Sequence, residues 1–414
     1  MNGHRIIRLH ESLPLPADPR VWAEIDSTAL ADNWRDLCDH IIRTSPDTYA
    51  MAVVKADAYG HGIYPAVHTL LRAGCRSFAL ACAEEAAAAR EIIRDEAIAS
   101  EAVELLVLGY TPVTDVRLLA THGITTTVLS EEYAKALSAA AVRDGLTVAC
   151  HIALDTGMHR IGLPACSEDE IADTTRAVAR IDRLPGLRIT GLFSHLSRAD
   201  EDRDAVLASD SHTMTQYRRF ALARESILAA LPRRHAPLVC HLCNSAAAVR
   251  FPDALPEGCL DAVRLGISLY GYGVARVDGR PLADRPVMKL KTRVVHLHTL
   301  RPGEQVGYGG DFTSDTPRII ATLPVGYADG FLRAFRGVSV TVHTRGGRVK
   351  APIVGRICMD QCMVDVTGLR VSVGDEVTLF GEEREELMAL ARRAGTIPYE
   401  LLCLITARVP RVIL

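Results

Sequence analysis

The 414-residue sequence has no apolar run that approaches the length of about 18 residues needed to cross a membrane. Its first residues, MNGHRIIRLHESLPLP, lack the continuous apolar stretch of a secretory signal, so we expect a short flexible leader over residues 1–20. Neither sign of charge is in large excess, because 47 Lys and Arg against 50 Asp and Glu give a formal net charge of −3. These absences argue against a membrane protein, a secreted protein and a dedicated nucleic-acid binder, which needs a basic face for the phosphates.

Cysteines arranged as a disulfide framework or as a metal site are also missing. The 11 cysteines are an odd number scattered over a long chain, and several lie inside apolar runs: Cys82, Cys150, Cys240 and Cys403. We therefore expect reduced, buried thiols and a cytoplasmic protein. The tightest cluster, the CHLC segment at residues 240–243, has no second ligand pair at matching spacing, so the sequence predicts no metal site.

What the sequence does contain is a regular alternation of short apolar runs and helix-like segments. The apolar, β-rich runs are Thr48–Val54, Ser77–Cys82, Val103–Leu108, Thr125–Leu129, Thr147–Leu154, Arg188–Phe193, Leu238–Leu242 and Ala262–Leu265. The helix-like segments include Ala83–Ile93, Glu131–Arg143, Glu168–Ile181 and Ser211–Ala230. About eight strand–helix units predict an α/β fold with a closed (β/α)8 TIM barrel over residues 21–285. Periodicity alone leaves an open, doubly wound sheet as the alternative.

The pattern changes after residue 285, where alternating strands separated by turn residues predict a mostly antiparallel β domain over residues 286–414. Its expected strands are Lys289–Leu300, Ile319–Leu323, Val338–Thr344, Val349–Val354, Met363–Val366 and Glu376–Leu379. A helical segment, Glu383–Arg393, is expected near the end. A further short strand, Trp22–Ile25, precedes a helix for which Ser27 or Thr28 is the expected N-cap. This strand lies upstream of the barrel pattern, so the pattern leaves open whether it belongs to the barrel or to the β domain.

Reactive and anion-binding residues follow the predicted barrel strands, at the end where such barrels build their active sites. They are Lys55, Asp155, Arg160, His195, Asn244, Ser245, Arg264 and Gly266. Each alone has a structural explanation; the Asn-Ser pair, for example, is a common helix cap. Together they provide a cation, a group that stacks on a ring and a phosphate cradle. The sequence therefore predicts a site for a phosphorylated cofactor.

The segment AVVKADAYGHG (52–62) resembles the pyridoxal-phosphate lysine motif of the alanine racemase family. Further matches follow in the family's order: LDTGMHRIG, FSHLSRADED, HLCNSAA, RLGISLYG, VGYGG, PVGYADGFLR, APIVGRICMDQCMVDV and TIPYELLCLI. The resemblance extends from about Val21 to the C-terminus. It implies an N-terminal barrel followed by a β domain, to which the strand at Trp22–Ile25 would belong.

The resemblance also implies roles for the barrel residues. Lys55 would hold pyridoxal 5'-phosphate covalently and act as one of two catalytic bases, and this requires a lowered pKa. His195 would pack against the pyridine ring, and Arg264 would face the pyridine nitrogen. The positions that match the phosphate-binding ones are Tyr59, Ser245, Gly266, Ile267 and Tyr399.

The second base implied by the resemblance is Tyr308, since racemisation needs acid/base groups on both faces of Cα. Arg160 would bind this tyrosine and the substrate carboxylate. Met359 and Asp360 would line the site, and Tyr327 would narrow its entrance. In the family the tyrosine comes from the second subunit, so the resemblance implies a homodimer with shared active sites.

The implied activity is interconversion of L- and D-alanine, as a source of D-alanine for peptidoglycan. The alternatives are a serine or broad-specificity racemase on the same scaffold and a non-catalytic pyridoxal-phosphate-binding protein. Related proteins of that last kind lack the β domain. A decarboxylase with a similar barrel and β domain would need different cofactor contacts, and the CMDQ and GYADG segments argue against it.

The sequence departs from the family pattern at Ala153. Most members have a lysine here, two residues before the aspartate of DTGM, and its carbamate holds the arginine that matches Arg160. Alanine carries no charge, and a buried guanidinium without a counter-charge is costly, so another anion should take that place. A bound chloride near Arg160 is the favoured substitute, and the carboxylate of Asp155 is the alternative.

Overall fold

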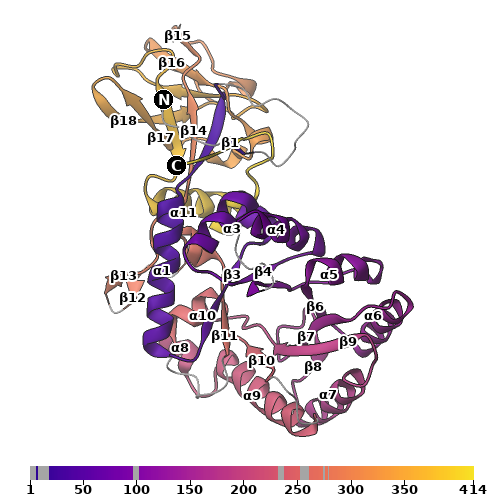
Figure 1. The fold of residues 1–414 in the computed structure, drawn as a ribbon. Coiled ribbons are helices and arrows are strands. Elements are labelled where there is room, and N and C mark those ends of the chain that lie inside the picture. Colours follow the sequence, from indigo (N-terminus) through magenta and orange to yellow (C-terminus); the bar gives the residue numbers. More distant parts are fainter. Residues whose placement is uncertain are drawn as a thin grey trace.

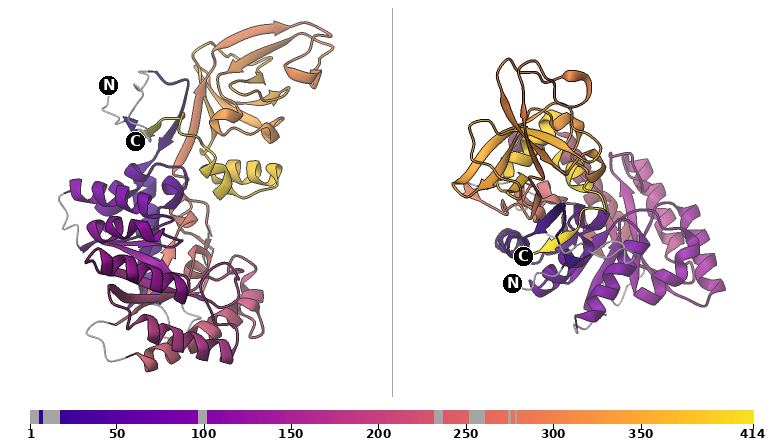
Figure 2. Two further views of the ribbon diagram at one scale, coloured as in Figure 1. Left: turned by 90° about the vertical axis from the view of Figure 1, so that its right-hand side faces the viewer. Right: turned by 90° about the horizontal axis from the view of Figure 1, so that it is seen from above.

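The computed structural model describes residues 6–7, 18–96, 102–231, 237–251, 261–273, 276–277 and 279–414. The chain forms a parallel β-barrel surrounded by helices, and a β domain that lies beside one end of the barrel (Figure 1). Figure 2 shows the same two bodies from two further directions, with the β domain offset to one side. The predicted fold class is confirmed.

Eight parallel strands form the barrel, and each is hydrogen-bonded to the next. They are β3 (Tyr49–Val53), β4 (Ser77–Leu80), β5 (Glu104–Val107), β6 (Ile124–Val128), β7 (Val148–Asp155), β9 (Leu187–Phe193), β10 (Val239–His241) and β11 (Ala262–Leu265). β11 pairs with β3 and completes the ring. An open sheet would leave two edge strands unpaired, so the doubly wound alternative is wrong. A two-residue strand, β8 (Leu163–Pro164), pairs with the end of β7.

The helices of the barrel lie between its strands. They are α1 (Ser27–Thr44), α2 (Lys55–Tyr59), α3 (Ile63–Arg72), α4 (Ala83–Asp95), α5 (Val116–His122), α6 (Glu131–Arg143), α7 (Glu168–Ile181), α8 (Arg203–Leu207), α9 (His212–Ala230) and α10 (Ser245–Arg250). The bounds of α6 and α7 are those predicted. Ser130 and Ser167 cap these two helices by accepting backbone N–H bonds, which is why the sequence pattern locates their starts.

The predicted cap of α1 is wrong. Asp26 is the N-cap, and its carboxylate accepts from the backbone N–H of Ala29 at 2.8 Å. The Ser27 hydroxyl instead donates to the backbone oxygen of Leu414, at the other end of the chain. Ser27 therefore makes a tertiary contact with the C-terminus in place of the predicted helix cap.

The β domain contains one twisted sheet whose strands are almost all antiparallel. Its order is β1 (Ile6–Ile7), β21 (Arg411–Ile413), β2 (Val21–Ile25), β14 (Met288–Arg293), β20 (Glu376–Phe380), β17 (Ser339–Thr344), β18 (Gly347–Val354), β19 (Cys362–Asp365), β16 (Arg318–Leu323) and β15 (His296–Leu300). β2 and β21 form its parallel pair. The strand expected at Trp22–Ile25 therefore belongs to the β domain. A two-stranded hairpin, β12 (Arg276–Val277) and β13 (Arg280–Pro281), precedes the domain.

The single strand predicted over Lys289–Leu300 is wrong, because the segment forms two strands. β14 pairs with β2 and β20, whereas β15 pairs with β16. The chain changes partners at Val294, whose N–H donates to the backbone oxygen of Asp375 at 2.9 Å. A continuous alternating pattern does not reveal a change of partner strand.

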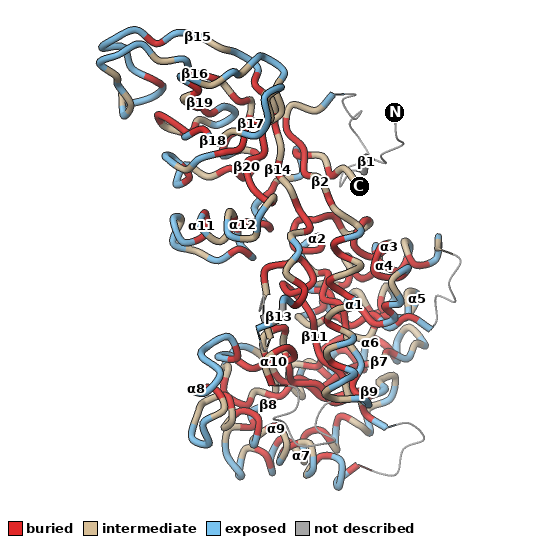
Figure 3. Tube along the Cα trace, turned by 90° about the vertical axis from the view of Figure 1, so that its left-hand side faces the viewer, coloured by how far each residue is buried: buried red, intermediate tan, exposed pale blue. Residues whose placement is uncertain are grey.

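Two helices of the C-terminal domain, α11 (Arg384–Ala394) and α12 (Pro398–Cys403), lie between the sheet and the barrel (Figure 3). One contiguous set of buried apolar side chains runs from the barrel into the β domain. This shared core holds α12 against α2, at the mouth of the barrel.

Both ends of the described chain meet in the sheet, where β1 pairs with β21. The rest of the predicted leader up to residue 17 lies outside the described residues. Within the described part, no helix combines the length and the apolar character of a membrane span.

Candidate active site

A cavity of about 860 Å³ lies at the carboxyl ends of the barrel strands. The predicted site residues that line it are Lys55, Tyr59, Arg160, His195, Ser245, Arg264, Gly266, Ile267 and Tyr399. Tyr399 comes from α12, so the C-terminal domain closes one side of the cavity in its own chain. Closure of the barrel brings the other residues together from widely separated loops.

Lys55 begins a backbone turn that is unusual for L-amino acids. The residues that follow it, Ala56–Tyr59, all have φ between 52° and 54°. The left-handed conformation costs roughly 1–2 kcal/mol for each residue that is not glycine. Contacts with other elements must therefore stabilise this turn, and through it the position of Lys55.

Two of these contacts come from α4 and α12. The Glu85 carboxylate accepts from the backbone N–H of Ala56 at 2.7 Å and of Ala81 at 3.0 Å, which joins the turn to the end of β4. A Cβ on Gly60 would lie 2.1 Å from the carbonyl oxygen of Leu402. Only glycine allows this approach, so α12 packs directly on the lysine turn.

A third contact comes from Arg411 in β21, a residue that the sequence analysis missed. Its buried guanidinium donates to the Gly60 carbonyl oxygen from Nε at 2.9 Å and from Nη2 at 2.7 Å. It also donates to the backbone oxygens of Ile405, Thr406 and Val409. One side chain thus joins the C-terminal segment to the lysine turn. No sequence signal marks it, since arginines are mostly exposed.

We expect Arg411→Met to lower the free energy of unfolding by about 3 kcal/mol or more, because methionine fills the space but leaves several buried carbonyl oxygens unpaired. Urea unfolding measures this. The matched control is Arg72→Met: this guanidinium lies 3.8 Å from Glu96 and is 70% exposed, so the expected change is below about 0.5 kcal/mol. Equal small losses in both variants would show that the Arg411 contacts do not stabilise the turn.

Tyr59, Ser245 and Gly266 form a polar cradle on one side of the cavity. The Gly266 N–H donates to Ser245 Oγ at 2.7 Å, and a Cβ on Gly266 would lie 2.6 Å from Tyr59 Oη. Glycine is therefore required for the tyrosine hydroxyl to reach this place. Burial raises the pKa of Tyr59, so its hydroxyl stays neutral and available as a donor. These groups follow β3, β10 and β11, which are neighbours in the barrel, and they fit a phosphate group.

Arg264 carries a buried positive charge at the cavity wall. Its Nη2 donates to the backbone oxygens of Ser194 and Leu242, each at 2.8 Å, and its Nη1 contacts His241 Nδ1. No carboxylate pairs with it among the residues that the structure describes. Burial lowers the pKa of Arg264 to about 10, so it is a cation at neutral pH.

His195 lies beside this arginine, with Nδ1 3.4 Å from Arg264 Nη2. Burial and the neighbouring cations lower the pKa of His195 to about 3, so the ring that lines the cavity is neutral. Behind Arg264, His241 Nε2 lies 3.0 Å from His151 Nδ1, and both rings are buried. In the sequence, His241 is part of the CHLC segment, and no pattern marks its contact with His151.

The pKa of Lys55 is lowered, first by burial and then by Arg160 and Arg264, while Cys403 and Glu85 act in the opposite direction. Loss of the proton turns the ammonium into an amine, which is a nucleophile and a base. The cavity therefore provides a lysine of the kind that forms covalent bonds with carbonyl compounds.

The other predicted residues do not line this cavity. Tyr308 is 73% exposed, Met359 54% and Tyr327 40%, and Asp360 is also exposed, all on the β domain. Tyr327 and Met359 are neighbours, because the Ala328 N–H donates to the backbone oxygen of Met359 at 3.0 Å. The structure thus separates the candidate site into a cavity in the barrel and an exposed group on the β domain.

The Tyr308 loop is held by side-chain contacts in spite of its exposure. Asp311 accepts from Arg356 Nε at 2.8 Å and from its Nη2 at 3.0 Å. A Cβ on Gly309 would lie 2.6 Å from Arg356 Cζ, so the loop lies flat on the guanidinium. Sequence reasoning missed Arg356 and Asp311, although the glycines beside Tyr308 indicate a close approach at this point.

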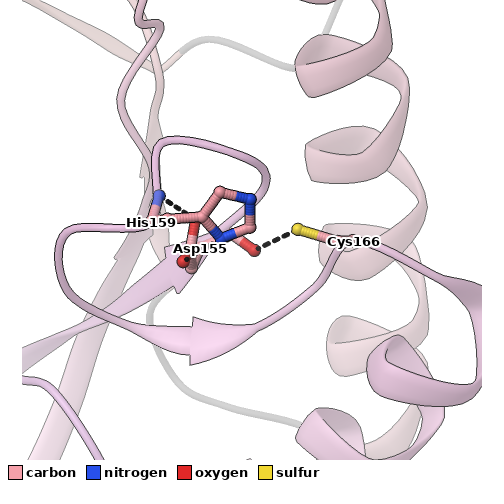
Figure 4. A group of neighbouring side chains, drawn as sticks. All are labelled: Asp155, His159 and Cys166. Atoms are coloured by element: carbon pink, nitrogen blue, oxygen red, sulfur yellow. Dashed lines mark hydrogen bonds and ion pairs between the residues drawn. The ribbon is translucent and has the colours of Figure 1, made fainter.

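Asp155 does not pair with Arg160. Its Oδ1 accepts from the backbone N–H groups of Gly157, Met158 and His159 at 3.0–3.1 Å, and its side chain faces its own loop (Figure 4). Arg160 itself is exposed, not buried as the counter-charge argument assumed, and no ion pair involves it among the described residues.

The cysteine prediction holds in part. Cys150 and Cys240 are buried free thiols, whereas Cys82 is half-buried. Cys403 is exposed and lines the cavity, so its predicted burial is wrong. Its apolar neighbours Leu401 and Leu402 are buried. Cys403 lies on another face of the short helix α12, which a count of apolar neighbours cannot show.

Two family models match the chain: alanine racemase, N-terminal domain, over residues 25–274, and alanine racemase, C-terminal domain, over residues 287–413. An alanine racemase of Clostridium novyi (strain NT) is 41% identical over 401 residues, which cover 95% of each chain. An alanine racemase of Geobacillus stearothermophilus is 39% identical over 402 residues, which cover 94% of this chain and 92% of the relative.

Solved structures agree with these matches. The alanine racemase of Clostridium difficile 630 has a TM-score of 0.82 and 32% identity, with 96% of this chain and 97% of the other covered. The alanine racemase of Bacillus anthracis with bound L-Ala-P has a TM-score of 0.79 and 30% identity, with 97% and 96% covered.

Proposed function

We propose that this chain, which belongs to the alanine racemase family, interconverts L-alanine and D-alanine with pyridoxal 5'-phosphate as its cofactor. The observation that carries the proposal is Lys55, with its lowered pKa, in a cavity that also contains the cationic Arg264. A phosphate cradle lies in the same cavity, so the residues present fit this cofactor.

When bound, the cofactor withdraws electrons from the substrate and makes the Cα proton acidic. Lys55 would hold the cofactor and move a proton on one face of Cα. His195 would pack against the cofactor ring, and Arg264 would face the ring nitrogen. The phosphate would be held by Tyr59, Ser245, Gly266, Ile267 and Tyr399.

A panel of single-enantiomer amino acids tests the proposal, scored for appearance of the opposite enantiomer by chiral chromatography. We expect alanine to have the highest kcat/KM. A second candidate, a serine or broad-specificity racemase, is favoured by the missing lysine at Ala153, which leaves space near Arg160. Faster turnover of serine would establish that candidate, and no turnover of any amino acid would favour a non-catalytic cofactor-binding protein.

We further propose a homodimer with shared active sites, in which Tyr308 of one chain serves as the second base for Lys55 of the other. Racemisation needs acid/base groups on both faces of Cα. Tyr308 does not line the cavity of its own chain, yet it is exposed on a well-supported loop. Tyr327, Met359 and Asp360 would enter the same shared site and contact the substrate there, and Arg160 would bind its carboxylate.

Mixing inactive Lys55→Ala protein with inactive Tyr308→Ala protein is therefore expected to restore activity. A heterodimer would contain one doubly damaged site and one intact site, so recovery approaches about a quarter of the wild-type rate when subunits exchange freely. Subunit exchange is followed with two affinity tags. Complete exchange without recovered activity would show that each site is built within one chain.

A small anion near Arg160 is proposed to replace the carbamylated lysine of relatives. A cavity of about 20 Å³ beside Arg160 has Ala153, Phe193 and His195 in its lining, and Asp155 lines it as well. This is enough for one water-sized ligand. The carboxylate of Asp155 faces its own loop, so it does not offer the charge.

We expect racemisation to be insensitive to bicarbonate and to fall several-fold when chloride is replaced by a bulky anion at constant ionic strength. The matched variant is Ala153→Lys, in which added bicarbonate should replace the need for chloride. Equal rates of the unmodified enzyme in both salts would exclude the anion.

We also propose a cytoplasmic location for the protein. Every cysteine that the structure describes is a free thiol, as is usual in a reducing compartment.

A further inference from the structure

Asp155, His159 and Cys166 bring three different metal-binding atoms together beside the loop that follows β7 (Figure 4). A carboxylate oxygen of Asp155, a ring nitrogen of His159 and Cys166 Sγ all lie within 4.8 Å of one another, and the Cys166 thiol donates to the Asp155 backbone oxygen at 3.5 Å. His159 Nδ1 is 3.3 Å from Asp155 Oδ2. The proposed racemisation gives no role to His159 or to Cys166.

The backbone preorganises this group. Oδ1 of Asp155 is occupied by three N–H donors of the loop, which leaves Oδ2 directed at His159. His159 has φ 55°, a strained conformation for a residue that is not glycine, and it places the ring beside the carboxylate. A different contact positions the cysteine: β7 pairs with β8, and the Ala165 N–H donates to the Asp155 carbonyl oxygen at 2.8 Å.

We propose that these three side chains bind a Zn²⁺ ion, with water as the fourth ligand. Zinc accepts oxygen, nitrogen and sulfur donors together, and its bonds of about 2.0–2.3 Å place tetrahedral ligands roughly 3.3–3.8 Å apart. Asp155 Oδ2 and His159 Nδ1 already have this spacing. Rotation of the Cys166 side chain brings Sγ to the same distance from these two atoms. The His159 side chain is 74% exposed, so an ion and its water reach the site from solvent.

The proposed ligands lie at positions i, i+4 and i+11 in the sequence. Because this spacing matches no usual zinc pattern, the sequence alone predicted no metal site. The usual zinc patterns combine pairs of closely spaced ligands. Here the strand pairing of β7 with β8, and not the spacing along the chain, brings Cys166 back to Asp155. A bound ion would fasten the loop that carries Arg160 to the start of α7.

Cobalt titration of the purified holoenzyme tests the site, because tetrahedral Co²⁺ with a thiolate ligand has d–d bands at longer wavelengths than the cofactor absorption. We expect one equivalent of Co²⁺ to produce these bands and one equivalent of Zn²⁺ to remove them. Cys166→Ser should abolish the bands, and His159→Gln should weaken binding by about tenfold or more. The matched control is Cys38→Ser, which changes another half-buried thiol and should leave the spectrum unchanged.

Bands that persist in Cys166→Ser, or that disappear in Cys38→Ser, would place the metal elsewhere and overturn the proposal. Octahedral spectra, or no saturable binding in the folded holoenzyme, would show that the three side chains form no metal site. Racemase activity of the metal-free enzyme is measured in parallel, and it tests the proposed function independently of the metal.

Discussion

Lys55→Ala is expected to abolish the visible absorption of the bound cofactor and to lower racemisation by at least about 10⁴-fold. Lys55 lines the cavity together with Arg160 and Arg264, and burial and these two cations lower its pKa, which favours the amine that attacks a carbonyl group. Alanine removes both the covalent attachment and one of the two bases. The measurements are the absorption spectrum after addition of pyridoxal phosphate and the rate from each alanine enantiomer.

The control is Lys135→Ala, which removes an exposed lysine that pairs with Glu131 on α6 and should leave both measurements unchanged. Borohydride reduction of the wild-type holoenzyme, followed by peptide mapping, should locate the cofactor on the peptide that contains Lys55. Attachment to a different lysine, or a normal spectrum in Lys55→Ala, would show that this residue has been assigned incorrectly.

The sequence predicted the fold well where local signals and burial agree. Strands β4 and β11 are buried along their whole length and are apolar except for Ser77 and Arg264, and α6 and α7 begin at serines that cap them. It failed where a partner distant in the chain decides the outcome. Ser27 donates to the last residue, and the strand predicted over Lys289–Leu300 changes partners at Val294.

The site residues, too, could be predicted from local signals but not where a partner distant in the chain decides their role. Residues at the ends of barrel strands could be predicted, since every strand of a closed barrel ends at one face. Arg411 could not, because its role depends on a C-terminal strand returning to the lysine turn. The left-handed conformation of Ala56–Tyr59 could not be predicted either, because two alanines and a tyrosine among these four residues do not indicate positive φ. Tyr308 was found through the family resemblance, and its place on the exposed face of the β domain leaves its role a proposal.

Tyr308→Ala is expected to reduce exchange of the Cα proton of L-alanine by about 10²–10⁴-fold, while exchange from D-alanine changes by less than about tenfold. The reason is that the tyrosine and Lys55 are proposed to serve opposite faces of Cα, with the tyrosine on the side of the L-enantiomer and Lys55 on the side of the D-enantiomer. Net racemisation cannot reveal this asymmetry. The two enantiomers have equal free energies, so kcat/KM must fall by the same factor in both directions.

Exchange in deuterium oxide, followed separately for each enantiomer by NMR with chiral derivatisation, reports on each base alone. Lys55 should still remove and return the proton of D-alanine in the variant, so deuterium should enter D-alanine without formation of the L-enantiomer. Tyr110→Phe provides the control, because this tyrosine is also exposed, at 58%, but lies in the loop after β5, and both exchange rates should be unchanged. Equal loss of exchange from both enantiomers in Tyr308→Ala would mean that the residue supports the site instead of moving a proton. Loss confined to L-alanine requires a group that approaches Cα from the face opposite Lys55, and an exposed tyrosine outside its own chain's cavity can do so only from a second subunit.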